Sequence, residues 1–324
     1  MMNNSHVIRS KHGTFYQYDP AWLETHVNEP AISNEVREIQ HLASAITGNS
    51  RIVWLLKAIS FIDLTSLNGN DTSTVIERLC KKAAQPVPKV PFKWEKPIYT
   101  AAVCVYPSRV MDAVNTLKSI NKTDIIKVAS VAAGFPSGQY PLQSRLEEVR
   151  CAIDYGAKEI DIVIDRSLVL DGKWEQLYDE LVAIRQVCDE KKKICLKTIL
   201  STGELGNLTN VYKAAMIAMM AGADFIKTST GKEAVNATLP VGIVMCQAIK
   251  EFARLTKKEI GFKPAGGIKT AQDALEWMTL MKKKLGIDWL INTRFRIGAS
   301  SLLDDVAREI EAHKCEELDS KELS

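Results

Sequence analysis

The central part of this 324-residue chain contains no histidine. The five histidines of the chain are His6, His12, His26, His41 and His313. Because residues 42–312 have no imidazole, we do not expect a Ser-His-Asp triad, a Cys-His dyad or a histidine-ligated metal there, unless a terminal segment folds back into the site. Lysine, aspartate, glutamate, tyrosine, serine and threonine remain as candidates for catalysis.

Paired cysteines and a leader-like segment are also missing. The seven cysteines include no C-x-x-C and form no zinc-ligand pattern with the histidines, which argues against a zinc module or a thioredoxin-type redox pair. The N-terminal residues MMNNSHVIRSKHG have no apolar run of the kind that a secretory signal needs. We therefore expect a cytoplasmic protein in a reducing compartment, with its cysteines as free thiols.

The sequence has neither a large excess of one charge nor a long apolar segment. Its 42 Lys+Arg oppose 39 Asp+Glu, for a formal net charge of +3, which gives no electrostatic case for nucleic-acid or membrane-surface binding. The longest strongly apolar stretch, residues 214–223, is about half as long as a membrane span. We therefore predict a globular protein whose partners are neither nucleic acid nor membrane.

A repeated alternation of short apolar runs and longer amphipathic segments begins near residue 58. The apolar runs, predicted as strands, are 57–64, 99–106, 125–132, 159–164, 194–200, 224–229, 259–264 and 295–300. The predicted helices after them are 71–84, 108–120, 142–155, 173–191, 207–221, 239–255, 270–285 and 301–313. Parallel strands need such crossover helices, and eight units in about 260 residues predict a (β/α)8 TIM barrel.

A doubly wound open sheet is the competing fold. It would normally need no eighth unit, and it would carry a glycine-rich fingerprint after the first strand, where this chain has DLTSLNGN. Residues 1–50 form no strand-helix unit, so we predict an N-terminal extension packed on the barrel, with helices over 21–25 and 33–46. The barrel domain would then span 51–313, followed by a polar C-terminal tail over 314–324.

Two lysines lie at the ends of consecutive predicted strands, where barrels place their active sites. They are Lys227 in DFIKTS and Lys263 in EIGFKP. A single buried lysine is explained most simply by a structural ion pair. Two of them on adjacent strands repel each other, and both repulsion and burial lower a lysine pKa. At least one of the pair should therefore supply the neutral amine that a nucleophile needs, which points to an imine-forming site.

One carboxylate, Asp161, interrupts the apolar run EIDIVI. The alternation of the strand puts aliphatic residues on one face and Glu159, Asp161 and Asp165 on the other, so we predict that the acidic face points into the barrel. Asp161 would either neutralise a lysine across the barrel or move protons to and from a carbinolamine, where no histidine is available.

Small-residue loops after the last two strands indicate a phosphate site. Gly266 and Gly267 follow the seventh strand, while Gly298, Ser300 and Ser301 follow the eighth and begin a helix. Backbone N–H groups of such loops bind phosphate in many barrels. Either loop alone is equally explained by a turn glycine or a serine N-cap, whereas the two together favour phosphate.

Several strings together resemble the 2-deoxyribose-5-phosphate aldolase family of class I aldolases. They are IDLT (62–65), CVYP (104–107), GFPSG (134–138), EIDIVI (159–164), LKTILSTGEL (196–205), GADFIKTSTGK (222–232), GFKPAGGIKTAQDA (261–274) and FRIGASSLL (295–303). The resemblance covers about residues 55–305 in unbroken order. KTSTGK together with GFKPAGG at this spacing is highly specific to that family.

The resemblance implies reversible cleavage of 2-deoxy-D-ribose 5-phosphate to acetaldehyde and D-glyceraldehyde 3-phosphate in deoxyribose phosphate catabolism, with no metal and no cofactor. It implies that Lys227 is the Schiff-base lysine, Lys263 the lysine that lowers its pKa, and Asp161 the acid/base partner. The substrate would lie near Asp63, Thr65, Lys197 and Thr230. The phosphate would lie near Gly231, Lys232, Gly266, Gly267, Lys269, Gly298, Ser300 and Ser301.

Cys104 ends the second predicted strand near the mouth of the barrel. It is either a thiol on the substrate side, open to reactive aldehydes, or a small buried apolar residue. The fold is also compatible with a homo-oligomer, although the sequence singles out no face for one.

The chain departs from the family in two ways. Compact members lack an extension like residues 1–50, and many bacterial members end in a tyrosine that assists proton transfer, whereas the last tyrosine here is Tyr212. Asp161 with water is then expected to protonate the enamine.

Two alternatives remain open. One is another Schiff-base barrel, such as a transaldolase or a keto-acid aldolase. A keto-acid aldolase is disfavoured because it would need an arginine for the substrate carboxylate, and no arginine ends the sixth or seventh strand. A non-catalytic scaffold acting through the extension is disfavoured by the presence of Lys227, Lys263 and Asp161 together.

Overall fold

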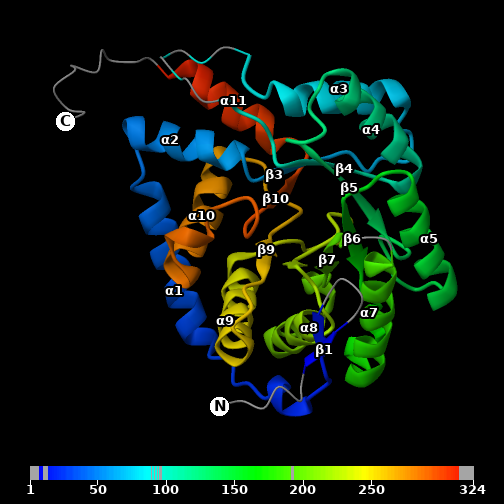
Figure 1. Ribbon diagram of the computed structural model, residues 1–324. Coiled ribbons are helices and arrows are strands. Elements are labelled where there is room, and N and C mark those ends of the chain that lie inside the picture. Colours follow the sequence, from blue (N-terminus) through cyan, green and yellow to red (C-terminus); the bar gives the residue numbers. More distant parts are fainter. Residues whose placement is uncertain are drawn as a thin grey trace.

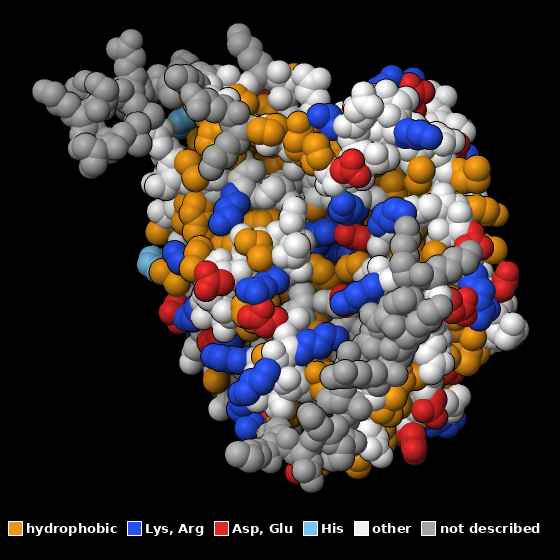
Figure 2. All heavy atoms as spheres, viewed as in Figure 1, with side chains coloured by type: hydrophobic (Ala, Val, Ile, Leu, Met, Phe, Trp, Pro, Cys, Tyr) orange, Lys and Arg blue, Asp and Glu red, His pale blue; other side chains and the backbone are white. Residues whose placement is uncertain are grey.

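The computed structural model describes residues 7–9, 14–88, 90, 92, 94, 97–190 and 193–313. Within them, parallel strands form a barrel that is surrounded by helices (Figure 1). The predicted C-terminal tail over 314–324 lies outside the described residues. Basic and acidic side chains are interspersed over the face shown in Figure 2, as the near-neutral charge of the chain leads one to expect.

The barrel is an eight-stranded parallel sheet, as predicted. Its strands are β3 (Ile62–Thr65), β4 (Ala102–Val105), β5 (Lys127–Ala132), β6 (Glu159–Val163), β7 (Cys195–Ile199), β8 (Phe225–Lys227), β9 (Gly261–Lys263) and β10 (Ile297–Ala299). They pair in the order β10-β3-β4-β5-β6-β7-β8-β9. Isolated parallel bridges, Phe262 to Phe295 and Ala265 to Gly298, join β9 to the last strand segment and close the barrel.

The crossover helices cover the outside of the barrel, which leaves the strands buried on both faces. They are α3 (Ser73–Ala84), α4 (Val110–Ser119), α5 (Leu142–Asp154), α6 (Arg166–Leu170), α7 (Trp174–Asp189), α8 (Leu208–Met220), α9 (Leu239–Thr256), α10 (Ala271–Leu285) and α11 (Leu302–Ala312). Short 3-10 turns are η3 (Pro107–Arg109), η4 (Thr202–Glu204) and η5 (Ile287–Trp289). None of the helices described is both long and apolar enough to pass through a bilayer.

The strand predicted over 57–64 is wrong in its first part. Helix α2 (Gly48–Ile59) occupies residues 57–59, and β3 begins only at Ile62. A short apolar run fits a buried helix as well as a buried strand, and Ile52, Leu55 and Ile59 are buried at helical spacing. Helix α2 also continues across residue 50, where the extension was predicted to end.

The N-terminal extension consists of the hairpin β1 (Val7–Arg9) and β2 (Thr14–Tyr16), the 3-10 turn η2 (Pro20–Leu23) and helix α1 (Glu29–Ser44). Helix α1 lies along α10 and α9 at one side of the barrel (Figure 1). The Tyr16 ring packs edge-on against Phe252, with centroids 5.4 Å apart. The Tyr178 hydroxyl donates to the Tyr16 carbonyl at 2.6 Å, so aromatic contacts and a buried hydrogen bond hold the extension on α7 and α9.

Candidate active site

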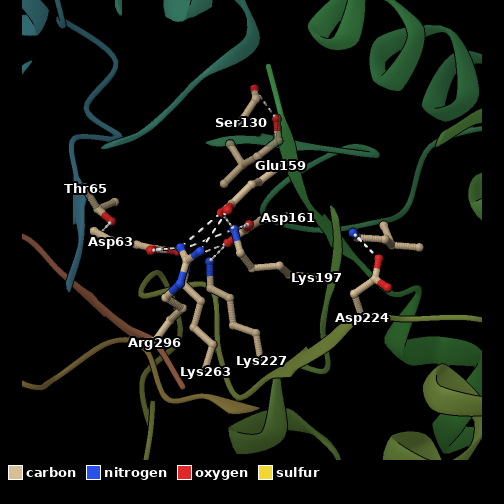
Figure 3. A network of polar contacts seen from close by, with 12 residues as sticks. Asp63, Thr65, Ser130, Glu159, Asp161, Lys197, Asp224, Lys227, Lys263 and Arg296 are labelled. Carbon is tan, nitrogen blue, oxygen red and sulfur yellow. Dashed lines mark hydrogen bonds and ion pairs between the residues drawn. The ribbon is translucent and has the colours of Figure 1, made fainter. Parts of the chain in front are cut away.

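A cluster of seven charged side chains fills part of the barrel interior (Figure 3). The carboxylates are Asp63 on β3 and Glu159 and Asp161 on β6; the cations are Lys197 on β7, Lys227 on β8, Lys263 on β9 and Arg296 just before β10. Each of these side chains belongs to a residue at most 5% exposed. Burial of so many charges is tolerable only because each one has a partner of opposite sign.

Strand register brings these groups together. Lys227 lies opposite Lys263 across β8 and β9, and Asp161 lies opposite Lys197 across β6 and β7. Side chains alternate along a strand, so Ile160 and other flanking aliphatic residues face the outer apolar core while Asp161 faces inward. The predicted inward position of Asp161 and the predicted proximity of the two lysines are both seen.

Lys227 and Lys263 share one oxygen of Asp161. The Lys227 Nζ donates to Asp161 Oδ2 at 2.9 Å, and the Lys263 Nζ donates to the same oxygen at 2.7 Å. Lys263 Nζ also donates to Asp63 Oδ2. Lys227 thus contacts one carboxylate, whereas Lys263 contacts two.

This difference separates the pKa values of the two lysines. Burial lowers the pKa of Lys227 below its ordinary value; Asp161 opposes that shift, and the positive charge of Lys263 adds to it. Burial also disfavours the charged form of Lys263, but Asp161 and Asp63 together raise its pKa above the ordinary value. The lowered pKa predicted for one member of the pair therefore belongs to Lys227.

Asp161 is held as a carboxylate. Burial by itself would raise its pKa, but Lys197, Lys227 and Lys263 lower that pKa well below the ordinary value. Lys197 Nζ donates to Asp161 Oδ1 at 2.8 Å and lies 2.6 Å from Glu159 Oε2. Burial disfavours the Lys197 cation, yet these carboxylates raise its pKa well above normal, so Lys197 stays charged.

Sequence reasoning placed Glu159 on the inward face but gave it no role in the site, and it did not include Arg296. The Arg296 guanidinium donates to Asp63 Oδ1 at 2.6 Å and binds Glu159 through two hydrogen bonds, at 2.8 Å to Oε1 and 3.1 Å to Oε2. The signal that could have found Arg296 is the one that found the lysines, because it interrupts the apolar run FRIGAS.

Asp165 does not share the inward acidic face predicted for it. It follows β6 and begins helix α6, where its side chain accepts a hydrogen bond from the Ser167 N–H at 2.9 Å. An aspartate at this position satisfies an otherwise free N–H group of the first helical turn.

A cavity of about 290 Å³ opens above the charged cluster, with Lys227 in its wall. All the residues predicted to bind phosphate line it: Gly231, Lys232, Gly266, Gly267, Lys269, Gly298, Ser300 and Ser301. Thr65 and Thr230 line it as well. Asp63 and Lys197 instead lie in the charged cluster.

The cavity wall is shaped by glycine and carries positive charge. Gly266 and Gly267 have φ angles of +83° and +80°, a backbone conformation that favours glycine. A Cβ on Gly266 would also lie 2.5 Å from the side-chain oxygen of Asn236. Lys232 and Lys269 add cations to this wall, and an anion would be attracted there.

Another part of the cavity wall was not predicted. Ser66, Leu67 and Asn68, which follow β3, line it. Asp71 holds this loop, because it accepts from the Ser66 hydroxyl at 2.9 Å and from the Asn68 N–H at 3.1 Å. In the sequence, the polar residues after β3 were interpreted only as lacking the glycine-rich fingerprint of a nucleotide-binding fold. The same residues could have indicated this part of the cavity wall.

Cys104 is fully buried in an apolar cluster with Ala102, Ala129 and Val131. Burial raises the pKa of its thiol, and the neighbouring Asp161 carboxylate adds to that shift. These surroundings agree with the small apolar alternative for Cys104.

The fold and the site together define a class of protein: a TIM barrel with a weakly basic lysine beside an anion-sized cavity, suited to carbonyl chemistry through an amine. Among the residues that the structure describes, no group of three or more histidines, cysteines, aspartates and glutamates could hold a metal ion.

Comparison with known proteins gives the family. The model of the DeoC/LacD family aldolases matches residues 57–307, so the chain belongs to that family of lyases. Human deoxyribose-phosphate aldolase is 55% identical to it, over 94% of this chain and 95% of that protein. The mouse protein of the same name is 53% identical, over 92% of this chain and 93% of that protein. A tetrameric deoxyribose phosphate aldolase from Aeropyrum pernix has the same fold, with a TM-score of 0.64 at 23% identity, over 85% of this chain and 98% of that one.

Proposed function

We propose that this aldolase cleaves 2-deoxy-D-ribose 5-phosphate reversibly to acetaldehyde and D-glyceraldehyde 3-phosphate, through a Schiff base on Lys227. The observation that carries the proposal is the lowered pKa of Lys227 in the wall of a cavity whose other residues suit a phosphate. The names of the human and mouse relatives support the same substrate.

The reaction begins when the neutral amine of Lys227 adds to the C1 aldehyde. The resulting carbinolamine gains a proton on its hydroxyl group and loses water, which leaves a protonated imine. Asp161, 2.9 Å from the amine, orients Lys227 and stabilises the positive charge that appears on nitrogen. The neutral form of Lys227 that starts the reaction follows from burial and from the charge of Lys263.

Bond cleavage follows from the electron-withdrawing imine. Removal of the proton from the C3 hydroxyl lets the C2–C3 bond break, with its electron pair moving toward the imine nitrogen. D-Glyceraldehyde 3-phosphate leaves, and the enamine of acetaldehyde remains on Lys227. Protonation of this enamine at C2 and hydrolysis of the new imine release acetaldehyde and restore the amine.

We assign proton transfer to Asp161 acting together with water, which takes up the C3 hydroxyl proton and returns a proton to C2 of the enamine. Asp161 is ionised at neutral pH, because three lysines lower its pKa. The proton that the enamine needs at C2 is therefore the one taken from the C3 hydroxyl, passed on through water beside this carboxylate. Lys263, whose Nζ is 2.7 Å from Asp161 Oδ2, keeps its own proton because its pKa is raised, and it holds the carboxylate in place.

The phosphate group would bind at the glycine loops, beside Lys232 and Lys269 and the beginning of α11. A keto-acid substrate is less suitable, because the buried Arg296 already binds Asp63 and Glu159 and is not free for a carboxylate. We also propose action in the cytoplasm, in deoxyribose phosphate catabolism, supported by the free cysteines among the described residues.

Reductive trapping tests the proposal. Sodium borohydride added with 2-deoxy-D-ribose 5-phosphate should inactivate the enzyme and leave a stable adduct on the peptide that contains Lys227, as mass spectrometry would measure. Lys227→Ala should lose both adduct and activity. Lys81→Ala, which changes an exposed lysine on α3, is the matched control and should keep both. An adduct on a different lysine, or activity in Lys227→Ala, would contradict the proposal.

A further inference from the structure

The charges in the barrel interior balance only if one cation is neutral. Asp63, Glu159 and Asp161 supply three negative charges. Lys197, Lys263 and Arg296 supply three positive charges, and Lys227 would be a fourth. Because an uncompensated buried charge is costly, a cluster with three fixed cations favours the neutral amine of Lys227.

Arg296 lies at the far end of a continuous chain of contacts to Lys227. Its guanidinium binds Asp63 Oδ1, and Lys263 Nζ binds the other oxygen of the same carboxylate. Lys263 then donates to Asp161 Oδ2, the oxygen that Lys227 also contacts. Arg296 is absent from the residues that line the cavity, so it acts on Lys227 through the charged cluster and not through contact with a substrate.

We propose that Arg296 is a positioning residue that keeps the amine of Lys227 uncharged, with Glu159 as its counter-charge. The proposal rests on the assignment of Lys227 as the nucleophile. The other groups that act on Lys227 are Asp161 from β6, Lys263 from β9 and Cys104 from β4.

An arginine suits this task better than a lysine would. Burial opposes its charge, but Asp63 and Glu159 raise its pKa further above the ordinary value, so the cation persists over the whole working pH range. Its planar group also holds Glu159 at both oxygens and Asp63 at one. Without that charge, three carboxylates would face only Lys197 and Lys263, and Lys227 would become the third cation.

Four variants separate charge from structure: Arg296→Gln, Arg296→Lys, Glu159→Gln and the double variant Glu159→Gln/Arg296→Gln. For each, the rate of acetaldehyde trapping on Lys227 by cyanoborohydride is measured against pH, with the modified peptide counted by mass spectrometry. A buried unit charge within about 10 Å shifts a pKa by about one unit at an effective dielectric constant near 20. Arg296→Gln should therefore move the inflection of the trapping rate up by about one pH unit.

The other variants should follow the charge count. Arg296→Lys keeps the positive charge and should keep the inflection of the unchanged enzyme. Glu159→Gln removes a negative charge and should lower the inflection by about one pH unit. The double variant restores the balance and should return to the original value, about one unit above Glu159→Gln. If Arg296→Gln alone does not fold, the difference in inflection between the double variant and Glu159→Gln measures the effect of the same Arg296 charge.

Two failures can be told apart. If the unchanged enzyme forms no adduct on Lys227, the Schiff-base function itself is wrong. If the adduct forms but its inflection is the same in Arg296→Gln, or differs equally in Arg296→Lys, the inference about Arg296 is overturned. An inflection shifted furthest in the double variant would likewise overturn it, because damage to the structure accumulates whereas compensating charges cancel.

Discussion

Replacing Lys263 by methionine should shift the pH dependence of catalysis strongly toward alkaline pH. The change removes the cation that shares Asp161 Oδ2 with Lys227, while keeping a side chain of similar length. Asp63 keeps Arg296 as its partner, so no carboxylate loses all of its partners. Asp161 Oδ2 would then keep its hydrogen bond from Lys227 and lose the one from Lys263.

The two nitrogens lie 2.9 Å and 2.7 Å from one oxygen atom. At a separation of about 5 Å and an effective dielectric constant of about 20, two unit charges repel by about 3 kcal/mol, which equals about two pKa units. Because this repulsion is one reason why the pKa of Lys227 is lowered, its removal should raise that pKa by about two units. The neutral amine would then appear only at higher pH.

The measurement is kcat/KM for the release of D-glyceraldehyde 3-phosphate as a function of pH. The acid-side inflection should rise by about two units, and below it the activity should be about 100-fold lower than that of the unchanged enzyme. Lys263→Arg, which keeps the positive charge, is the control and should retain the original inflection. An unchanged inflection in Lys263→Met would refute the electrostatic reasoning. An equal loss at every pH would show that Lys263 moves protons and does not set the pKa of Lys227.

Three further changes test other parts of the structure. Gly298→Ala should lower activity and destabilise the fold by about 1–3 kcal/mol in urea unfolding, because its Cβ would lie 2.8 Å from the Ala265 Cβ; an unchanged midpoint would contradict this. Lys232→Met should raise KM about tenfold and leave kcat nearly constant, and should weaken inhibition by inorganic phosphate; a loss in kcat alone would argue against a phosphate contact. Tyr178→Phe should cost about 1 kcal/mol of stability and spare activity, since it removes the hydrogen bond to Tyr16, and full stability would show that this bond contributes nothing.

The barrel could be predicted because its strands are buried on both faces. That burial produces near-continuous apolar runs, and a charged residue inside such a run is conspicuous. Lys227, Lys263 and Asp161 were found in this way, and parallel register does bring them together. Strand alternation alone was enough to predict that Asp161 faces inward.

The difference between the two lysines could not be predicted, because it depends on contacts between distant segments. Lys263 has a raised pKa since it contacts Asp63 as well as Asp161, and Asp63 lies 200 residues away in sequence. Arg296 and Glu159 are 137 residues apart. Nothing local to either residue indicates such a pairing.

Local ambiguity accounts for the remaining differences. The run before Ile62 is apolar enough for a strand, but Leu55 and Ile59 face the core at the spacing of a helix. Asp165 continues the alternation of β6 only in the sequence, because the strand ends at Val163 and the chain turns into α6. In both cases the position at which an element ends decided the result, and patterns locate ends poorly.

Ribosomal synthesis produces the N-terminal extension first and its packing partners last. The Tyr16 and Trp22 rings rest on Phe252, and Glu35 pairs with Lys284 at 2.7 Å. At about 5–20 residues per second, about 10–50 seconds pass between the synthesis of the residues in the extension and the synthesis of the residues that they contact. During that time the apolar face of α1 has no barrel surface to cover it. The extension is therefore placed last although it is made first, and a chain that stops before α10 would leave α1 without its main packing partner.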